Sequence, residues 1–136
     1  MKLNHYVKLF SVAAVAFLAL DFIWLLFIAK KIYQDYLGYL LGPTKIIPAA
    51  VFYILYLIGI LFFVIYPAIE KESLMYAISA GALLGVLCYG TYDLTNLSTI
   101  KDWPLFVTII DLVWGGFVTA ATCGITVFVA QHFNWR

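Results

Sequence analysis

Four long apolar stretches divide the chain, and polar residues gather between them. Each stretch is about 20 residues or longer, which is enough for a helix to cross the hydrocarbon core of a membrane. Pro48 and Pro104 fit first helical turns, where a missing backbone N–H costs nothing. The predicted fold class is all-α: a polytopic membrane protein with a bundle of four transmembrane helices. The chain, 1–136, is predicted to form a single integral membrane domain with helices at about 7–29, 46–66, 73–97 and 104–130.

A shorter amphipathic pattern follows the first span, over residues 31–41. Its apolar positions recur at helical spacing, with polar residues mostly between them: Ile32, Tyr33, Tyr36, Leu37 and Leu40. The pattern predicts a short interfacial helix, with Lys30 and Lys31 ending the span before it. Two interpretations stay open. The segment is either an ordinary connector with tyrosines at the lipid headgroups or a lid over an opening at that face.

The N-terminus has some features of a signal peptide, because Lys2 and Lys8 flank the start of an apolar run. The run continues through Ala29, so we expect an uncleaved first transmembrane helix. An even number of spans puts both termini on one side of the membrane, here named side A, and the loops after the first and third spans on side B. The eight Lys and Arg residues divide equally between the two sides, so the positive-inside rule gives no orientation.

Composition supports a membrane location. The chain is 65% hydrophobic and 11% charged, more apolar than a soluble domain of this length could bury. A net charge of +1 provides no basic surface for nucleic acid, so membrane lipids are the predicted partners, and a homo-oligomer stays open. Cys88 and Cys123 lie in apolar stretches at different predicted depths, which favours buried thiols over a disulfide.

Small residues predict close contact between the third and fourth spans. In the third span the residues at steps of four are Ala77, Gly81, Gly85, Tyr89 and Asp93. In the fourth span the same step gives Gly116, Ala120 and Gly124. Small side chains at this spacing allow two membrane helices to approach closely. The stripe on the third span therefore begins with tight packing and ends with polar groups on the same face.

Three of the spans carry one acid each: Asp21, Asp93 and Asp111. Counted from the predicted side-B ends of the helices, they lie about 12, 6 and 10 Å deep, at a rise of 1.5 Å per residue. An acid in hydrocarbon is costly unless it has a partner. We therefore expect all three to share one pocket in the side-B half. Burial and mutual repulsion disfavour three charges, so at least one is expected to hold a proton at neutral pH.

Neighbours on the same helix faces extend this predicted pocket. The predicted ligand-binding residues are Asp21, Asp93, Asp111, Asn96, Tyr89, Trp24, Trp114 and Thr108. The ring of Tyr53 is predicted to form a further part of the aromatic wall of this pocket. Trp24 is expected near the side-B interface and Trp114 near the membrane centre, where its indole N–H needs an acid or a backbone carbonyl as acceptor. Trp103 and Trp135 are assigned to the interfacial belts.

The chemistry of the pocket leaves several functions open. Carboxyls that share a proton could serve an acid/base reaction or a proton relay, and with Asn96 they could bind a hard cation. No spacing identifies a transition metal, a phosphate loop or a catalytic triad, so no cofactor and no catalytic residue is assigned. The leading hypothesis is binding, with or without acid/base conversion, of a small amphipathic or lipid-like molecule that enters from side B. The alternatives are proton or cation movement, and a structural subunit whose acids only hold helices together.

Several segments also resemble a known family. They are YDLTNLST at 92–99, the following Trp103-Pro104, DLVWG at 111–115 and DFIW at 21–24. Together they resemble a bacterial family of small predicted membrane proteins catalogued as domain of unknown function 2177. The resemblance covers nearly the whole chain and implies a four-helix protein of the bacterial inner membrane. It carries no activity over to this chain.

Overall fold

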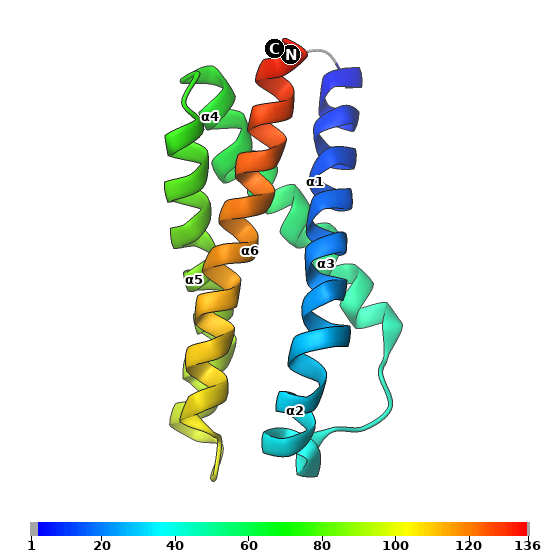
Figure 1. Cartoon of the computed structure of the whole chain (residues 1–136), viewed down its shortest axis with the longest axis vertical. Helices are drawn as coiled ribbons and strands as arrows, with labels where there is room; N and C mark the ends of the chain where they lie inside the picture. The colour runs from blue at the N-terminus through cyan, green and yellow to red at the C-terminus, as the bar shows by residue number, and fades with distance from the viewer. Residues whose placement is uncertain (1–2, 136) are drawn as a thin grey trace.

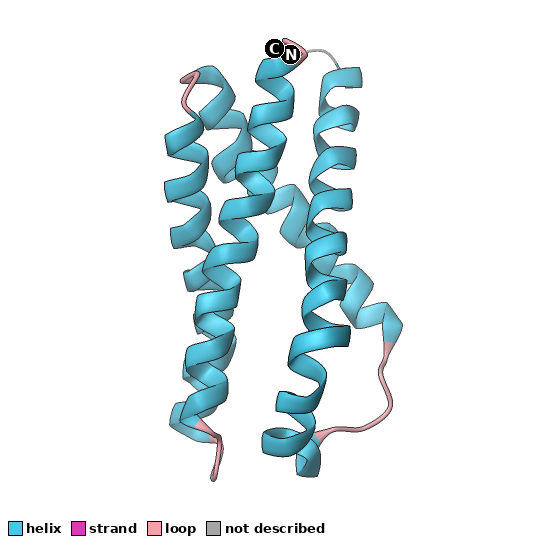
Figure 2. Ribbon diagram, viewed as in Figure 1, coloured by secondary structure: helices cyan, strands magenta, loops and turns pink. Residues whose placement is uncertain are grey.

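The computed structural model describes residues 3–135, and nearly all of them are helical (Figure 2). The elements are α1 (Leu3–Ile23), the π-helical η1 (Trp24–Ala29), α2 (Lys30–Leu37), the 3-10 turn η2 (Gly38–Leu40), α3 (Ile46–Ile60), the π-helical η3 (Leu61–Ile65), α4 (Tyr66–Glu70), α5 (Leu74–Thr99) and α6 (Leu105–His132). Adjoining elements form four apolar helical segments long enough to cross a membrane: Leu3–Leu40, Ile46–Glu70, Leu74–Thr99 and Leu105–His132. The predicted four-helix membrane bundle is confirmed.

The four segments form an up-and-down bundle. In Figure 1, α5 and α6 run side by side along the long axis, and the α3–η3–α4 segment crosses obliquely behind α1 and α6. Both termini lie at one end, which is side A, and the 41–45 loop and the α5–α6 turn lie at the other, side B (Figure 1). The structure thus has the even number of crossings that the hydrophobic pattern predicts.

The most extensive packing in the bundle is between α5 and α6. A Cβ atom added to Gly85 would lie 2.0 Å from the carbonyl oxygen of Gly115 and 2.6 Å from Oγ1 of Thr119, so the two backbones touch at this point. A Cβ on Gly81 would lie 3.2 Å from Cβ of Cys123. The close approach predicted from the glycines is confirmed, and it exists because no side chain holds the backbones apart.

The register of this pair differs by one residue from the predicted stripe on the fourth span. A Cβ on Gly115 would lie 2.4 Å from Cγ of Tyr89, whereas the neighbouring Gly116 faces Val86. Positions four apart on α5 therefore meet positions four apart on α6, running in opposite directions: Gly81 with Cys123, Gly85 with Thr119, and Tyr89 with Gly115. Gly115, which lies outside the predicted stripe, is part of the contact face.

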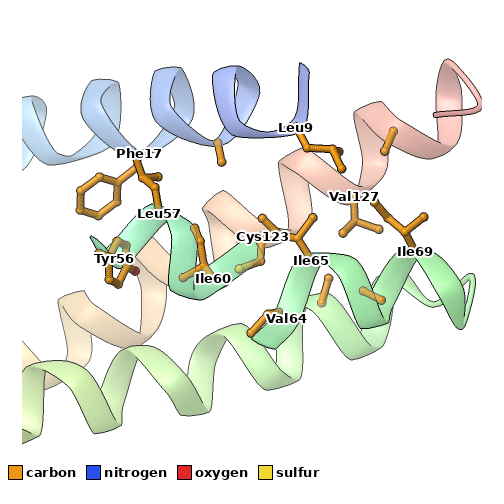
Figure 3. Close-up of a cluster of buried hydrophobic side chains, with 14 of the residues drawn as sticks. Leu9, Phe17, Tyr56, Leu57, Ile60, Val64, Ile65, Ile69, Cys123 and Val127 are labelled. Atoms are coloured by element: carbon orange, nitrogen blue, oxygen red, sulfur yellow. The ribbon is translucent and has the colours of Figure 1, made fainter. Parts of the chain in front are cut away.

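The apolar core fills the side-A half and the middle of the bundle (Figure 3). Phe17 from α1 packs against Tyr56 from α3, with ring centroids 4.8 Å apart. The Tyr56 hydroxyl and Oγ1 of Thr119 are hydrogen bonded, so this buried polar pair is satisfied. Cys123 is fully buried and Cys88 is half-buried, and both are free thiols.

The turns between the helices are set by local chemistry. Ser73 caps α5, because its Oγ accepts a hydrogen bond from the backbone N–H of Tyr76 at 3.0 Å. Glu72, just before it, has a φ of 54° and turns the chain out of α4. On side B, Asp102 has a φ of 63°, and Pro104 then precedes α6. These short turns hold α5 antiparallel to its neighbours on both sides.

The first helical segment corrects one prediction. Lys30 and Lys31 do not end it, because the helical backbone continues through them to Leu40. Long lysine stems can carry the charged ends to water while the backbone stays helical, so a pair of lysines is a weak stop. Just before the lysines the turns widen from α to π over Trp24–Ala29, which changes the direction in which later side chains point.

The segment after the lysines docks on the side-B turn. Leu37 is buried against Trp103 and Val107, and Tyr36 packs on Phe106 with centroids 5.1 Å apart. The Tyr39 hydroxyl donates a hydrogen bond to the carbonyl oxygen of Asp102 at 3.0 Å. Elements α2 and η2 thus pack on the α5–α6 turn, and the choice between lid and ordinary connector for 31–41 stays open.

The bundle predicts that both termini face the same compartment. Reporters of compartment fused in turn to the N-terminus and to the C-terminus should give the same result, because four crossings return the chain to its starting side. Opposite results from the two fusions would exclude a four-span topology.

The α5–α6 contact predicts a large difference between two glycines. Gly85→Ala should lower the free energy of unfolding by about 3 kcal/mol, because its Cβ would meet the Gly115 backbone. In mild detergent this corresponds to a fall in Tm of about 10 °C. The matched control is Gly59→Ala, whose Cβ would meet nothing within 4 Å. An equal Tm for the two variants would refute the close approach.

Candidate functional site

A cavity of about 410 Å³ lies in the side-B half of the bundle, and it is named here the side-B cavity. Its walls come from α1, η1, α2, α3, α5 and α6. They are formed by Asp21, Trp24, Leu25, Tyr33, Ala49, Phe52, Tyr53, Cys88, Tyr89, Tyr92, Asp93, Asp111 and Trp114. All three membrane acids line it, together with Trp24, Trp114 and Tyr89 from the predicted set.

Asp21 is fixed by two donors from two other helices. The Tyr53 hydroxyl on α3 donates to Oδ2 at 2.7 Å, and the indole Nε1 of Trp114 on α6 donates to Oδ1 at 3.4 Å. The acceptor that Trp114 needs is therefore an acid, one of the two kinds that the sequence allowed. Asp21 thus connects α1, α3 and α6 through both of its oxygens.

Asp93 and Asp111 form the second polar group of the cavity. Their carboxyls lie against each other across the α5–α6 contact, continuing the register in which Tyr89 meets Gly115. Asp111 also accepts a hydrogen bond from the hydroxyl of Tyr33. No hydrogen bond joins the two carboxyls in the described structure. Two acids this close in a membrane cannot both be charged at little cost, so the expectation that one of them holds a proton stays a prediction.

Asp93 is the less satisfied member of this pair. Its side chain is only 1% exposed, and neither of its carboxyl oxygens has a hydrogen-bond donor among residues 3–135. The polar group that faces it, Asp111, is itself an acid. A buried acceptor without a donor loses its hydration without compensation. Asp93 thus presents acceptor capacity to the cavity that the described chain does not use.

Trp24 and Trp114 stack on each other, with ring centroids 4.6 Å apart and planes inclined by 6°. The expectation that they lie at different depths is therefore wrong. The predicted depth was counted from a helix end at Ala29, but the helix continues to Leu40, so Trp24 lies deeper than that count placed it. Nε1 of Trp24 is 3.5 Å from the Tyr33 hydroxyl, so the stack connects the Asp21 group with the Asp93–Asp111 pair.

Two predicted site residues do not line the cavity. Thr108 is buried, accepts a hydrogen bond from Nε1 of Trp103 at 3.0 Å, and lies 3.5 Å from the carbonyl oxygen of Asp93. It therefore supports the backbone behind the acid. Asn96 is half-buried near the side-B end of α5. Trp103, assigned from the sequence to an interfacial belt, is buried at 7% exposure under α2.

Tyr33 lines the cavity although its place in the sequence pattern assigns it only to the interfacial segment. Residues nine apart, such as Trp24 and Tyr33, lie on opposite faces of a regular α-helix at about 100° per residue. The π-helical turns between them change that relation and bring both side chains to the cavity. Periodicity assumes one helical geometry, so it could not have found this pair.

The cavity opens between α3 and α5. The most exposed residues in its wall are Phe52 on α3, at 46%, and Tyr92 on α5, at 61%. α3 packs against α1 and has little contact with α5, and the two helices lie apart at the side-B end (Figure 1). Both belong to segments long and apolar enough to span a membrane, so we expect the opening to face lipid.

The three aspartates do not meet at one point. Within the described chain, no group of three or more His, Cys, Asp or Glu side chains is placed to hold a metal ion. The acids are arranged as one close pair, Asp93 with Asp111, and one separate group around Asp21. The site therefore has two polar ends, and aromatic rings lie between them.

Comparison with known proteins gives a family and no activity. A family model described as predicted membrane protein (DUF2177) matches residues 6–128. No curated protein and no solved structure matches the chain. The match covers most of the sequence, including all the cavity-lining residues, so the chain belongs to the DUF2177 family of predicted membrane proteins.

Proposed function

We propose that this protein binds a small amphipathic or lipid-like molecule in the side-B cavity, and that the molecule enters laterally from the bilayer of the bacterial cytoplasmic membrane. One observation carries the proposal: an aromatic cavity in the spanning region opens towards lipid and has acids in its wall. Its volume of about 410 Å³ is within the usual range for ligand pockets. Apolar walls with a few convergent polar groups are also typical of such pockets.

The acids do not all serve as attachments between helices. An acid that holds helices together needs donors on its neighbours. Asp21 has two such donors, Tyr53 and Trp114, so a structural role accounts for it. Asp93 has none in the described chain, although it is buried. A structural role leaves the burial of Asp93 unexplained, whereas a ligand that donates hydrogen bonds explains it.

The same pair supports acid/base chemistry on a bound molecule. A protonated carboxyl can give its proton to a ligand, and an ionised neighbour can take one from it. Tyr33 fixes the position of Asp111, so the pair is held ready before a ligand arrives. This step belongs to the proposal as its second part, and it depends on binding.

Movement of protons or cations across the membrane receives less support. The buried side chains in the side-A half of the described bundle are mostly apolar, including Leu9, Ile65 and Val127 (Figure 3). The buried polar side chains there are threonines such as Thr122 and Thr126, and none of the buried charged residues lies in that half of the described chain. A proton or cation path through it would need titratable groups or a chain of water. The polar groups that do occur at the side-B cavity lead sideways to lipid, which suits a ligand better than an ion.

Asparagine replacements separate the two roles. Asp93→Asn should leave the Tm within about 3 °C of wild type, since the amide retains an oxygen and supplies an N–H for Asp111. It should also abolish retention of any molecule that co-purifies with the wild type, as measured by mass spectrometry of organic extracts. The matched control is Asp35→Asn, an exposed acid on α2, which should change neither quantity. Undiminished retention in Asp93→Asn would count against a functional site.

Removal of one hydroxyl tests the contact between α2 and the acid pair. Tyr33→Phe should reduce stability by about 1–2 kcal/mol, because Asp111 loses its donor. Hydrogen exchange of residues 30–40 should become faster as the segment loosens. Tyr36→Phe is the matched control, since that ring is more exposed and packs on Phe106. Identical exchange in the two variants would mean that the hydroxyl contributes nothing to docking.

A further inference from the structure

The charge of the side-B cavity wall points to one class of ligand. Three acids line the cavity, and its lining contains no Lys, Arg or His residue. An anionic amphiphile would be repelled by this wall. A neutral alcohol could donate one hydrogen bond but could not take up a proton, so it would place no positive charge beside the acids. A cationic amphiphile would provide both a charge and donors.

The number of free acceptors refines this choice. Both oxygens of Asp93 lack a donor within the described chain, and Asp111 beside it accepts from Tyr33. A primary ammonium has three N–H donors and no acceptor, like the end of a lysine side chain. It can therefore serve both oxygens of Asp93 and one of Asp111. A quaternary ammonium has no N–H and would leave these oxygens unsatisfied.

The aromatic wall fits the same group. Tyr89 and Tyr92 lie on the α5 side of the cavity, Tyr53 lies on α3, and the Trp24–Trp114 stack spans the space between the two polar ends. Aromatic faces attract organic cations, most strongly where water is excluded. An alkyl tail would leave between Phe52 and Tyr92, where the cavity opens to lipid.

We propose that the ligand of the side-B cavity is an amphipathic primary amine, bound as its ammonium form with the nitrogen at Asp93 and Asp111 and the apolar tail directed between α3 and α5. This inference rests on the proposed function and specifies its ligand. An amine that arrives through hydrocarbon arrives neutral, as R–NH₂. The proton held by one of the two carboxyls then moves to nitrogen and gives R–NH₃⁺ beside two carboxylates. The total charge of the site is unchanged by this transfer.

The test compares four probes with the same chain length: dodecylamine, dodecanol, dodecyltrimethylammonium and dodecanoic acid. Binding to the full chain in mild detergent is measured by native mass spectrometry and by quenching of tryptophan fluorescence. Dodecylamine should bind at least about tenfold more tightly than each of the other three. In Asp93→Asn this preference should fall to about twofold or less, while Asp35→Asn should retain it.

The outcomes distinguish the ligand class from the proposed function. Equal binding of dodecylamine and dodecanol, unchanged in Asp93→Asn, would refute the preference for a primary amine but not the binding of an amphiphile in the cavity. Equal binding of the trimethylammonium probe would overturn recognition through N–H donors. If no probe binds and the wild type carries no co-purified amphiphile, both the inference and the proposed function fail. A Tm of Asp93→Asn close to wild type shows that a lost preference is not caused by unfolding.

Discussion

The close approach of α5 and α6 is the contact on which the rest of the bundle depends. Once Gly85 lies against the Gly115 backbone, positions four apart along the two antiparallel helices must meet in order. Two turns towards side B from Gly85, that order brings Asp93 to Asp111. The acid pair is therefore a consequence of the glycine contact. A packing that separated the helices would also separate the acids.

A second feature shapes the side-B end: the first span changes from α-helical to π-helical turns over Trp24–Ala29. The π turns bring Tyr33 to Asp111, and α2 then continues over the α5–α6 turn, where Leu37 is buried against Trp103. The same element thus provides a donor for Asp111 and packs on the α5–α6 turn. π-Helical turns are uncommon and occur often at functional sites, which agrees with this position.

Asp21 and Asp93 are both buried in the cavity wall, but only Asp21 has hydrogen-bond donors within the described chain. Asp21 is buried and has a donor for each oxygen, so its burial costs little. Asp93 is equally buried and has none in the described chain. Stability alone does not explain such a group, because burying an apolar residue of similar size would cost less free energy. This asymmetry is the physical basis for proposing a structural role for Asp21 and a binding role for Asp93.

The sequence by itself determined the number of spans, the close approach of the third and fourth spans, and the half of the bundle in which the acids lie. These features follow from length, apolar composition and spacing within one helix. Each can be read from neighbouring residues of a single segment. The partners across helices were decided only by the tertiary structure. The stack of Trp24 on Trp114 and the bond from Tyr33 to Asp111 join residues about 80–90 positions apart. They depend on a π segment and on a helix that continues past Lys30 and Lys31, and neither has a signature in a hydrophobic pattern that assumes regular α-helices.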